Sequence, residues 1–163
     1  MELHPGLSVT PAAMRQTLAC FTTGLAVVAA EVDGRVVGMP ANSLSSVSLD
    51  PPLVSLAFAH SSTTSPVLQR AGRWGISVLG EEQARVLQDL RRPAAERFDG
   101  VEMVIDDGAA FVRGALAMIT VTPRDTIQAG DHALVLLKVT SLYRDRSQRP
   151  LVFFDSAIHN LSH

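Results

Sequence analysis

Two stretches of the chain are rich in hydroxyl side chains, which can bind polar ligands. Residues 42–48 read Asn-Ser-Leu-Ser-Ser-Val-Ser, and residues 60–65 read His-Ser-Ser-Thr-Thr-Ser just before Pro66. Hydroxyls at a helix start, together with free backbone N–H groups and the positive end of the helix dipole, suit a phosphate group without any lysine. The amide and hydroxyls of residues 42–48 could hydrogen-bond the edge of a planar heterocycle. The sequence therefore offers two candidate parts of a ligand site.

Each stretch also has an ordinary structural explanation. Ser and Thr are common in turns and helix caps, so either stretch taken alone is more often a turn or a cap than a site. A third candidate is Gly130-Asp131-His132, where a loop is expected to enter a strand. A lone histidine in such a place is just as well explained as a surface residue at a strand edge. From the residues alone, both explanations remain open.

Several well-known catalytic motifs are absent from the sequence. It contains no G-x-G-x-x-G, no P-loop, no G-x-S-x-G and no H-E-x-x-H. These absences argue against Rossmann, kinase, esterase and zincin chemistry. The histidines are scattered without the spacing of metal ligands, so no metal site is expected. They are His4, His60, His132, His159 and His163.

Composition limits the kinds of partner that the chain can have. Its 163 residues are enough for one domain with a full hydrophobic core. The chain is 47% hydrophobic and only 18% charged, below the roughly 25% charged residues that are usual. This low charge suggests that a partner subunit covers part of the surface. The formal net charge of −2 provides no basic field for a phosphate backbone, so nucleic acid is not an expected partner.

No segment of the sequence indicates a membrane or export. The longest uninterrupted apolar run, Leu25 to Ala30, is far shorter than the ~20 residues of a membrane-spanning helix. The first residues include the acidic Glu2 and lack the basic and apolar regions of a signal peptide, so we expect a cytoplasmic protein. The single cysteine, Cys20, falls in an apolar helical pattern and is expected to be a buried thiol.

Mostly β elements must position the candidate residues. Thr10-Pro11 predicts a helix start. Met14, Leu18 and Phe21 lie on one face of this helix, which we expect to pack on a sheet. Asp33-Gly34 predicts a tight hairpin turn between two strands. Strands are expected at 25–31, 35–37, 54–58, 74–78, 116–122, 133–142 and 151–154, and short helices at 66–72 and 81–90.

The predicted strands are too frequent and too closely joined for a sheet with helical crossovers. We therefore expect a mainly β fold, a closed or nearly closed antiparallel barrel with a few short helices. Side chains fill the interior of a small barrel, so a ligand would bind at its mouth or at a seam between subunits. No repeat, low-complexity tract or linker divides the chain, which indicates one compact unit.

A longer pattern joins residues 21–28 (FTTGLAVV) to residues 38–54 (GMPANSLSSVSLDPPLV). It continues with Ser61-Ser62-Thr63, Gly72-Arg73-Trp74, Arg97-Phe98, Gly130-Asp131-His132 and residues 150–154 (PLVFF). Together these residues resemble the flavin reductase-like family over about Met14 to Leu161. The combination of S-V-S-L-D-P-P with a downstream G-D-H is specific. On this resemblance, residues 1–13 are an N-terminal extension and residues 14–163 are the family domain.

The resemblance implies a fold, an activity and partners. The fold is a split β-barrel (FMN-binding split barrel) of Greek-key type, in a homodimer that binds FMN or FAD near the subunit seam. The activity is that of an NAD(P)H:flavin oxidoreductase, which reduces free flavin with NADH or NADPH. Many family members supply the reduced flavin to a separate monooxygenase. The alternative is a flavin-binding or flavin-storage protein without significant reductase activity.

The resemblance also assigns residues to the flavin site and the nicotinamide site. Residues 40–43 and 46–48 would contact the isoalloxazine ring and ribityl chain, and residues 61–63 would hold the phosphate. The catalytic residue His132 would lie beside the nicotinamide. The implied flavin-binding residues are Pro40, Ala41, Asn42, Ser43, Ser46, Val47, Ser48, His60, Ser61, Ser62, Thr63, Arg97, Phe98 and Phe153.

Two positions depart from the family pattern. Many members have Thr where this chain has Pro40, which leaves only backbone contacts there. Many have Lys, Arg or Asn before the Ser pair, where this chain has His60. The lack of a catalytic dyad agrees with the implied reaction, because hydride passes directly between the two ring systems and the protein mainly orients them. On this resemblance, His132 would position the nicotinamide and could donate a proton to reduced flavin.

Overall fold

The computed structural model describes residue 6 and residues 8–161. Within these residues, no helix is both long and apolar enough to cross a membrane. The helical segments are α1 (Pro11–Leu18), α2 (Ser65–Leu68), the single 3-10 turn η1 (Glu81–Gln83) and α3 (Ala84–Asp89). The strands are β1 (Thr23–Gly24), β2 (Ala26–Val32), β3 (Arg35–Ala41), β4 (Ser45–Leu49), β5 (Pro52–Ala59), β6 (Trp74–Val78), β7 (Met103–Asp106), β8 (Ala109–Val112), β9 (Ala117–Ala129), β10 (His132–Arg144), β11 (Leu151–Phe154) and β12 (Ala157–Asn160).

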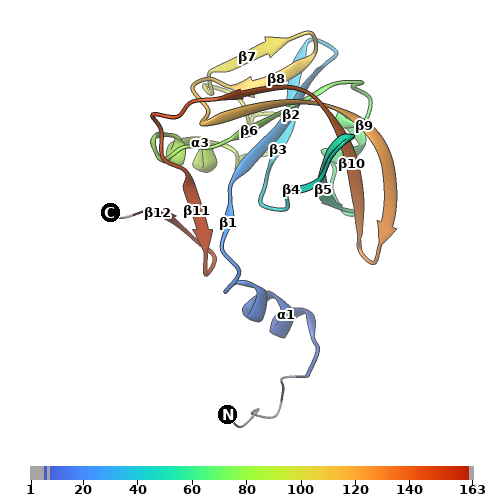
Figure 1. Ribbon diagram of the computed structural model, residues 1–163, viewed down its shortest axis with the longest axis vertical. Helices are drawn as coiled ribbons and strands as arrows, with labels where there is room; N and C mark the ends of the chain where they lie inside the picture. The colour runs from blue at the N-terminus through green and yellow to red at the C-terminus, as the bar shows by residue number, and fades with distance from the viewer. Residues whose placement is uncertain (1–5, 7, 162–163) are drawn as a thin grey trace.

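The strands form a large curved sheet and a small one (Figure 1). The large sheet has the order β4-β5-β10-β9-β6-β2-β8-β7, and β3 is added through its pairing with β2. The small sheet has the order β1-β11-β12 and lies beside α3 in Figure 1. The paired strands run antiparallel throughout. The mainly β architecture expected from the sequence is therefore confirmed.

β2 forms the centre of the fold because it is buried on both faces. It pairs with β3, β6 and β8. Successive side chains of a strand point to opposite faces. Val28 therefore packs in a cluster with Leu56 and Trp74, whereas Val27 packs in a second cluster with Leu79. Burial on both faces explains the continuous apolar run in this part of the sequence.

Glycines allow two close approaches that bring the strands of the barrel together. A Cβ atom on Gly38 in β3 would lie 2.3 Å from the carbonyl oxygen of Val28. A Cβ atom on Gly75 in β6 would lie 2.2 Å from the carbonyl oxygen of Ala110. Neither position has room for a side chain, so both strands depend on glycine for their packing. The first approach fixes β3 just before the candidate ligand-binding segment 40–48.

Two hairpins have turns that the residue types explain. Asp33 and Gly34 have φ of 51° and 73°, as a type I′ turn requires, and they join β2 to β3 as predicted. Gly130, with φ of 64°, lies in the turn between β9 and β10. These two strands have 13 residues each and are longer than the sequence indicated. The long hairpin ends in the candidate residues Asp131 and His132.

The first helix does not pack as predicted. α1 projects away from the sheets in Figure 1, and none of its residues is buried. Met14, Leu18 and Phe21 are 51%, 60% and 75% exposed. The expectation that this face packs on a sheet is wrong for the single chain, because amphipathic spacing identifies an apolar face but not the surface that covers it. Cys20 is exposed as well, so the expectation of a buried thiol is also wrong.

Candidate functional site

The segment from β3 to β4 carries the first group of candidate residues. Pro40 and Ala41 are the last residues of β3 and are half-buried, and Asn42 is exposed. The hydroxyl of Ser43 accepts a hydrogen bond from the backbone N–H of Ala57 (3.0 Å) and lies 3.4 Å from the carbonyl oxygen of the same residue. Ser43 therefore attaches the loop to the edge of β5, a structural role that leaves Asn42 as the open polar side chain.

A β-bulge shapes the next part of the same segment. The pairing of β4 with β5 shifts between Ser46 and Ser48, which leaves Val47 without a direct partner. Ser46 is exposed, Ser48 is half-buried, and the Val47 side chain is 49% exposed. Bulges redirect side chains and are common beside binding sites. The structure thus presents a hydroxyl and an apolar side chain together on an edge strand.

In the second hydroxyl-rich stretch, one hydroxyl bonds to the backbone and others are exposed to solvent. The Ser62 hydroxyl accepts from the backbone N–H of Ser65 (3.1 Å) and lies 3.9 Å from the sulfur of Met39. Ser62 is therefore a turn residue, as the ordinary explanation of this stretch proposed. Ser61 and Thr63 are exposed.

The short helix after this stretch weakens the helix-dipole argument. α2 has only four residues, Ser65–Leu68, and the preceding Thr64 makes no side-chain capping bond. Because the dipole of a helix sums over its aligned peptide units, a single turn offers little positive potential for a phosphate. The positive charge near this stretch must come from another part of the chain.

Arg97 supplies a positive charge next to the second stretch. Its Nη1 donates to the carbonyl oxygen of Gly38 (2.8 Å) and to the hydroxyl of Thr64 (3.1 Å). It thus links β3 to residues 60–65, two segments that carry candidate residues. Its Nε is buried and has no partner among the described residues, and burial lowers the pKa of the guanidinium. No carboxylate of the described residues forms an ion pair with it.

An arginine that is held in place without a carboxylate partner fits an anionic ligand. A guanidinium has five N–H donors in a planar fork that matches phosphate oxygens, and only Nη1 has partners here. A partly buried cation is unfavourable unless an opposite charge approaches it. The residues present therefore fit the phosphate of a flavin nucleotide at this position.

Asp131 orients the predicted catalytic residue His132. Its Oδ1 lies 2.7 Å from Nδ1 of His132, and this hydrogen bond is the main reason that the pKa of Asp131 is lowered. The backbone N–H of His60 donates to the carbonyl oxygen of Asp131 (3.0 Å). His132 also pairs with Ala59 at the end of β5. The structure therefore brings Gly130-Asp131-His132 to the same corner of the barrel as the His60 stretch.

The two predicted phenylalanines pack against the core. Phe98 and Phe153 are half-buried and contact the second hydrophobic cluster, which includes Val27 and Leu79. Phe98 follows Arg97 directly in the sequence, so its packing anchors the segment that carries the arginine. Phe153 in β11 also lines a hollow whose lining includes Asn42.

Sequence reasoning missed the residues that complete this hollow. It is lined by Arg15, Leu18, Ala19, Phe21, Thr23, Asn42, Phe153 and Ser156. The Thr23 hydroxyl is buried without a hydrogen-bond partner among the described residues, and such a group is costly unless a ligand or water pairs with it. Thr23 belongs to the T-T-G run of the family pattern, which was the signal available in the sequence.

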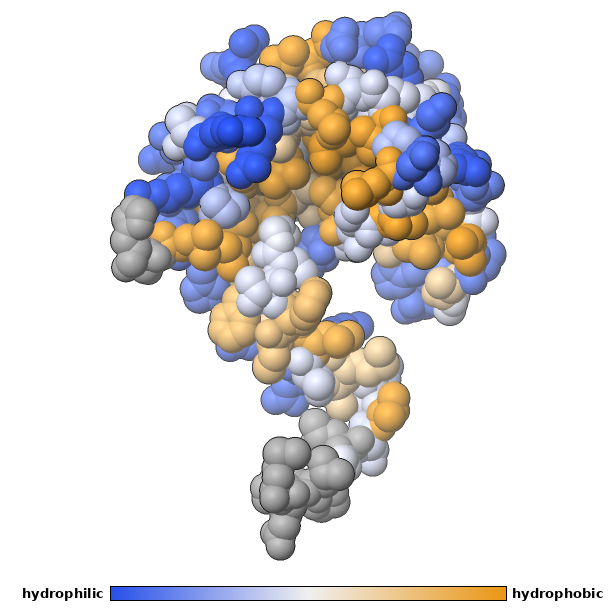
Figure 2. Space-filling view, in the orientation of Figure 1, coloured by the Kyte–Doolittle hydropathy of each residue, from blue (hydrophilic) through white to orange (hydrophobic). Residues whose placement is uncertain are grey.

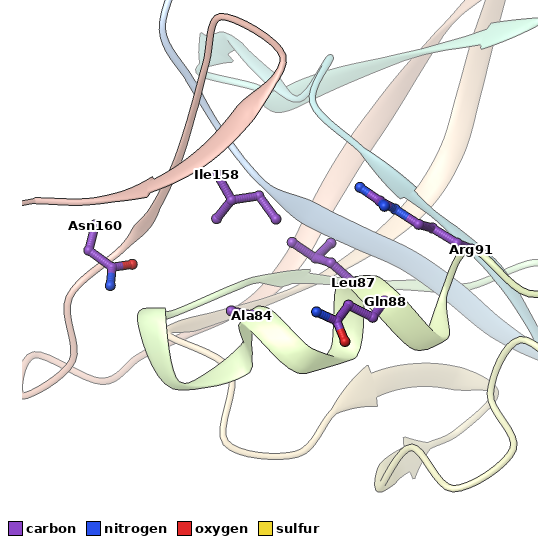
Figure 3. A pocket seen from close by; sticks show the side chains of 6 residues that line it. All are labelled: Ala84, Leu87, Gln88, Arg91, Ile158 and Asn160. Atoms are coloured by element: carbon purple, nitrogen blue, oxygen red, sulfur yellow. The ribbon is translucent and has the colours of Figure 1, made fainter.

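Another hollow lies between α3 and β12 and contains none of the predicted residues (Figure 3). Leu87 and Arg91 project from the α3 region, and Ile158 faces them from the β12 hairpin. Its lining is linked to the candidate residues by Ile158, which pairs with Phe153 in the β11–β12 hairpin. No group of three or more His, Cys, Asp or Glu side chains in the described part of the chain could hold a metal ion.

The barrel rim thus combines exposed hydroxyls, an arginine without a carboxylate partner and an oriented imidazole. The mouth of a β-barrel is a common place for a ligand site with a few convergent polar groups. The model of the flavin reductase like domain matches residues 18–162 of this chain. The chain therefore belongs to the flavin reductase-like family, which confirms the resemblance seen in the sequence.

Curated relatives carry flavin reductase names. NADH-dependent flavin reductase StyB from Pseudomonas fluorescens is 36% identical over 156 residues, covering 89% of this chain and 86% of the relative. An NADH-dependent flavin reductase from a Rhodococcus species is 34% identical, covering 98% and 90%. A probable flavin reductase from Rhizobium meliloti is 38% identical over 133 residues, but this chain spans only 43% of its length.

Solved structures of flavin reductases share the fold. NADH:FAD oxidoreductase SgcE6 from Streptomyces globisporus superposes with a TM-score of 0.89 at 26% identity, covering 98% of this chain and 100% of that one. The styrene monooxygenase flavin reductase SMOB from Pseudomonas putida S12 has a TM-score of 0.82 at 34% identity, with 91% and 97% covered. The split β-barrel that the family resemblance implied is confirmed.

Proposed function

We propose that the chain is a flavin reductase that uses NADH or NADPH to reduce FMN or FAD and supplies the reduced flavin to a partner monooxygenase. The observation that carries the proposal is Arg97, which joins β3 to the His60 stretch and has no carboxylate partner among the described residues. Relatives named NADH-dependent flavin reductases support the same activity. One relative is named as the reductase subunit of a flavin-dependent monooxygenase, which supports the proposed partner.

The protein contributes binding and orientation to this reaction. The flavin and nicotinamide rings supply the redox chemistry, in which a hydride moves from nicotinamide C4 to flavin N5. In the proposal, Arg97 and the exposed hydroxyls of Ser61 and Thr63 hold the flavin phosphate. The bulged strand β4 presents Ser46 and Val47 to the ring system. Holding two rings in contact at the reacting atoms can remove several kcal/mol of barrier.

His132 has a separate role in the proposal. Its Nδ1 lies 2.7 Å from the carboxylate of Asp131, which fixes the plane of the imidazole and leaves Nε2 for a ligand. Nε2 can hydrogen-bond the carboxamide of a nicotinamide or provide the proton that completes reduced flavin. Because the His132 side chain is 44% exposed, a ligand can reach it from the mouth of the barrel.

A homodimer in the cytoplasm, where reduced nicotinamide is available, is part of the same proposal. Apolar side chains gather on α1 and over parts of the barrel face in Figure 2. Leu18, Phe21, Leu49 and Leu142 are each at least 60% exposed. Exposed apolar side chains of this size are expected where a second subunit docks. Light scattering at micromolar concentration should give the mass of a dimer, whereas the mass of a single chain would refute this part.

The activity has a simple test. The purified protein is mixed with NADH, and NADH consumption is followed with and without added FMN or FAD. Rapid consumption that requires added flavin is expected of a reductase that treats flavin as a diffusing substrate. A protein that binds flavin but leaves NADH unchanged would instead be a flavin-binding or flavin-storage protein.

A further inference from the structure

A polar groove lies next to the proposed phosphate position and has no role in the proposed reaction. One side consists of residues from the end of β5 to α2, and the other side consists of residues from the β9–β10 hairpin. It is lined by Phe58, Ala59, His60, Ser62, Ser65, Pro66, Gln69, Thr126, Gln128 and Ala133. Ser62 belongs both to this groove and to the stretch that Arg97 contacts through Thr64. A ligand held at Arg97 could therefore extend into the groove.

The polar groups of the groove are amides and hydroxyls. The amide nitrogen of Gln69 donates to the Ser65 hydroxyl (3.1 Å). The side chains of Thr126 and Gln128 have no hydrogen-bond partner among the described residues and are exposed. They lie two positions apart on β9 and therefore share one face of the strand, the face that lines the groove. The groove thus offers a free amide and a free hydroxyl to a ligand.

The lining excludes some ligand classes. No Asp, Glu, Lys or Arg lines the groove, so nothing there would pair with a second phosphate or a carboxylate. The groove encloses about 190 Å³, less than the roughly 300–1,000 Å³ of a site for a whole drug-sized ligand. The uncharged lining and the small volume both match an uncharged, polar fragment of a larger molecule.

We propose that this groove binds the adenine base of a dinucleotide whose phosphate lies near Arg97. The amide of a glutamine presents one donor and one acceptor side by side, which matches N7 and the N6 amino group of adenine. The exposed ring of Pro66 and the exposed imidazole of His60 offer flat surfaces on which a base can stack. The inference rests on the proposed flavin reductase function and adds the part of the dinucleotide that the chain recognises.

Two dinucleotides carry the same adenine, namely FAD and NADH. If the base belongs to FAD, the groove makes the chain prefer FAD over FMN, which has no adenine. If the base belongs to NADH, the groove does not affect flavin choice and contributes to nicotinamide binding. Measuring the binding of FMN, FAD and NADH separately distinguishes these sources.

The test uses Gln128→Leu, which keeps the approximate size of the side chain and removes its hydrogen bonds. Titration calorimetry gives Kd for FMN and for FAD, and initial rates give KM for NADH. Loss of a paired contact to adenine should weaken FAD about tenfold or more while leaving FMN unchanged. Thr126→Val is the second variant in the groove. Gln88→Leu, an exposed glutamine of α3 outside the groove, is the matched control, and thermal melts confirm folding.

Each outcome has a clear meaning. A selective loss of FAD affinity supports the inference with FAD as the source, and a selective rise in KM for NADH supports it with NADH as the source. Unchanged FAD and NADH binding in both folded groove variants would overturn it. Equal losses for FMN and FAD would also overturn it, since FMN has no base to lose. Failure of the wild-type chain to bind either flavin would instead refute the proposed function.

Discussion

Replacing Arg97 tests the proposed phosphate position most sharply. In Arg97→Met, a phosphate would lose a charge-assisted hydrogen bond, which contributes about 1.5–3 kcal/mol. This corresponds to a roughly ten- to hundredfold weaker binding of FMN. Riboflavin lacks the phosphate, so its affinity should change little. The measurement is a fluorescence titration of both ligands against wild type and variant.

Arg97 also holds two parts of the fold together, so the experiment must distinguish this structural role from phosphate binding. The variant loses the bonds to Gly38 and Thr64, and each bond from a charged donor contributes about 1.5–3 kcal/mol to stability. A lower melting temperature is therefore expected alongside the loss of FMN affinity. Arg97→Lys restores the charge and should recover part of the FMN affinity, and Arg91→Met serves as an exposed control outside the site. Equal losses for FMN and riboflavin in the folded variant would show that Arg97 only supports the loop.

Three further predictions concern single side chains of the described structure. Ser62→Ala should remove about 0.5–2 kcal/mol of stability, because the variant loses the bond from the Ser65 N–H. Thr63→Ala should instead weaken FMN binding at an unchanged melting temperature. A loss of FMN binding in the first variant and of stability in the second would contradict these two roles. His132→Ala should lower kcat/KM for NADH roughly ten- to hundredfold with unchanged flavin affinity, and unaltered stopped-flow reduction at every NADH concentration would remove His132 from the site. Hydrogen bonds lower the pKa of Asp145, and the bond from the Ser147 hydroxyl has the largest effect. The ionised Asp145 therefore stabilises the fold fully above the unfolded pKa of about 3.9. This contribution is lost as the pH falls through the lower pKa of the folded state. Acid titration of Asp145→Asn should therefore show a smaller loss of stability than that of wild type, and parallel curves would contradict the assignment.

Several elements could be predicted from the sequence because their signals are local. Asp33-Gly34 supplies the two positive φ angles of its turn, and alternation of apolar residues identified β6. β8 was missed because all four of its residues are buried, which removes the alternation. β4 was missed because a serine-rich strand resembles a loop. Short strands without alternation therefore escape pattern reasoning.

The candidate site was less accessible to sequence reasoning. Arg97 was implied only by the family resemblance, because its contacts with Gly38 and Thr64 join segments far apart in the chain. The spacing of residues in the sequence does not predict contacts between such distant segments. The sequence also could not show that the Ser43 and Ser62 hydroxyls bond to the backbone while Ser46, Ser61 and Thr63 stay exposed. Which hydroxyls are available is decided by the tertiary structure.

Anaerobic stopped-flow reduction with deuterated NADH tests the central claim most directly. The protein with one equivalent of flavin is mixed with NADH that carries deuterium at either position of nicotinamide C4, and loss of the flavin's visible absorbance is followed. The account predicts rapid reduction that slows for one of the two labelled forms, because the protein holds one face of the nicotinamide against the flavin. Reduction no faster than that of free flavin with NADH would contradict it.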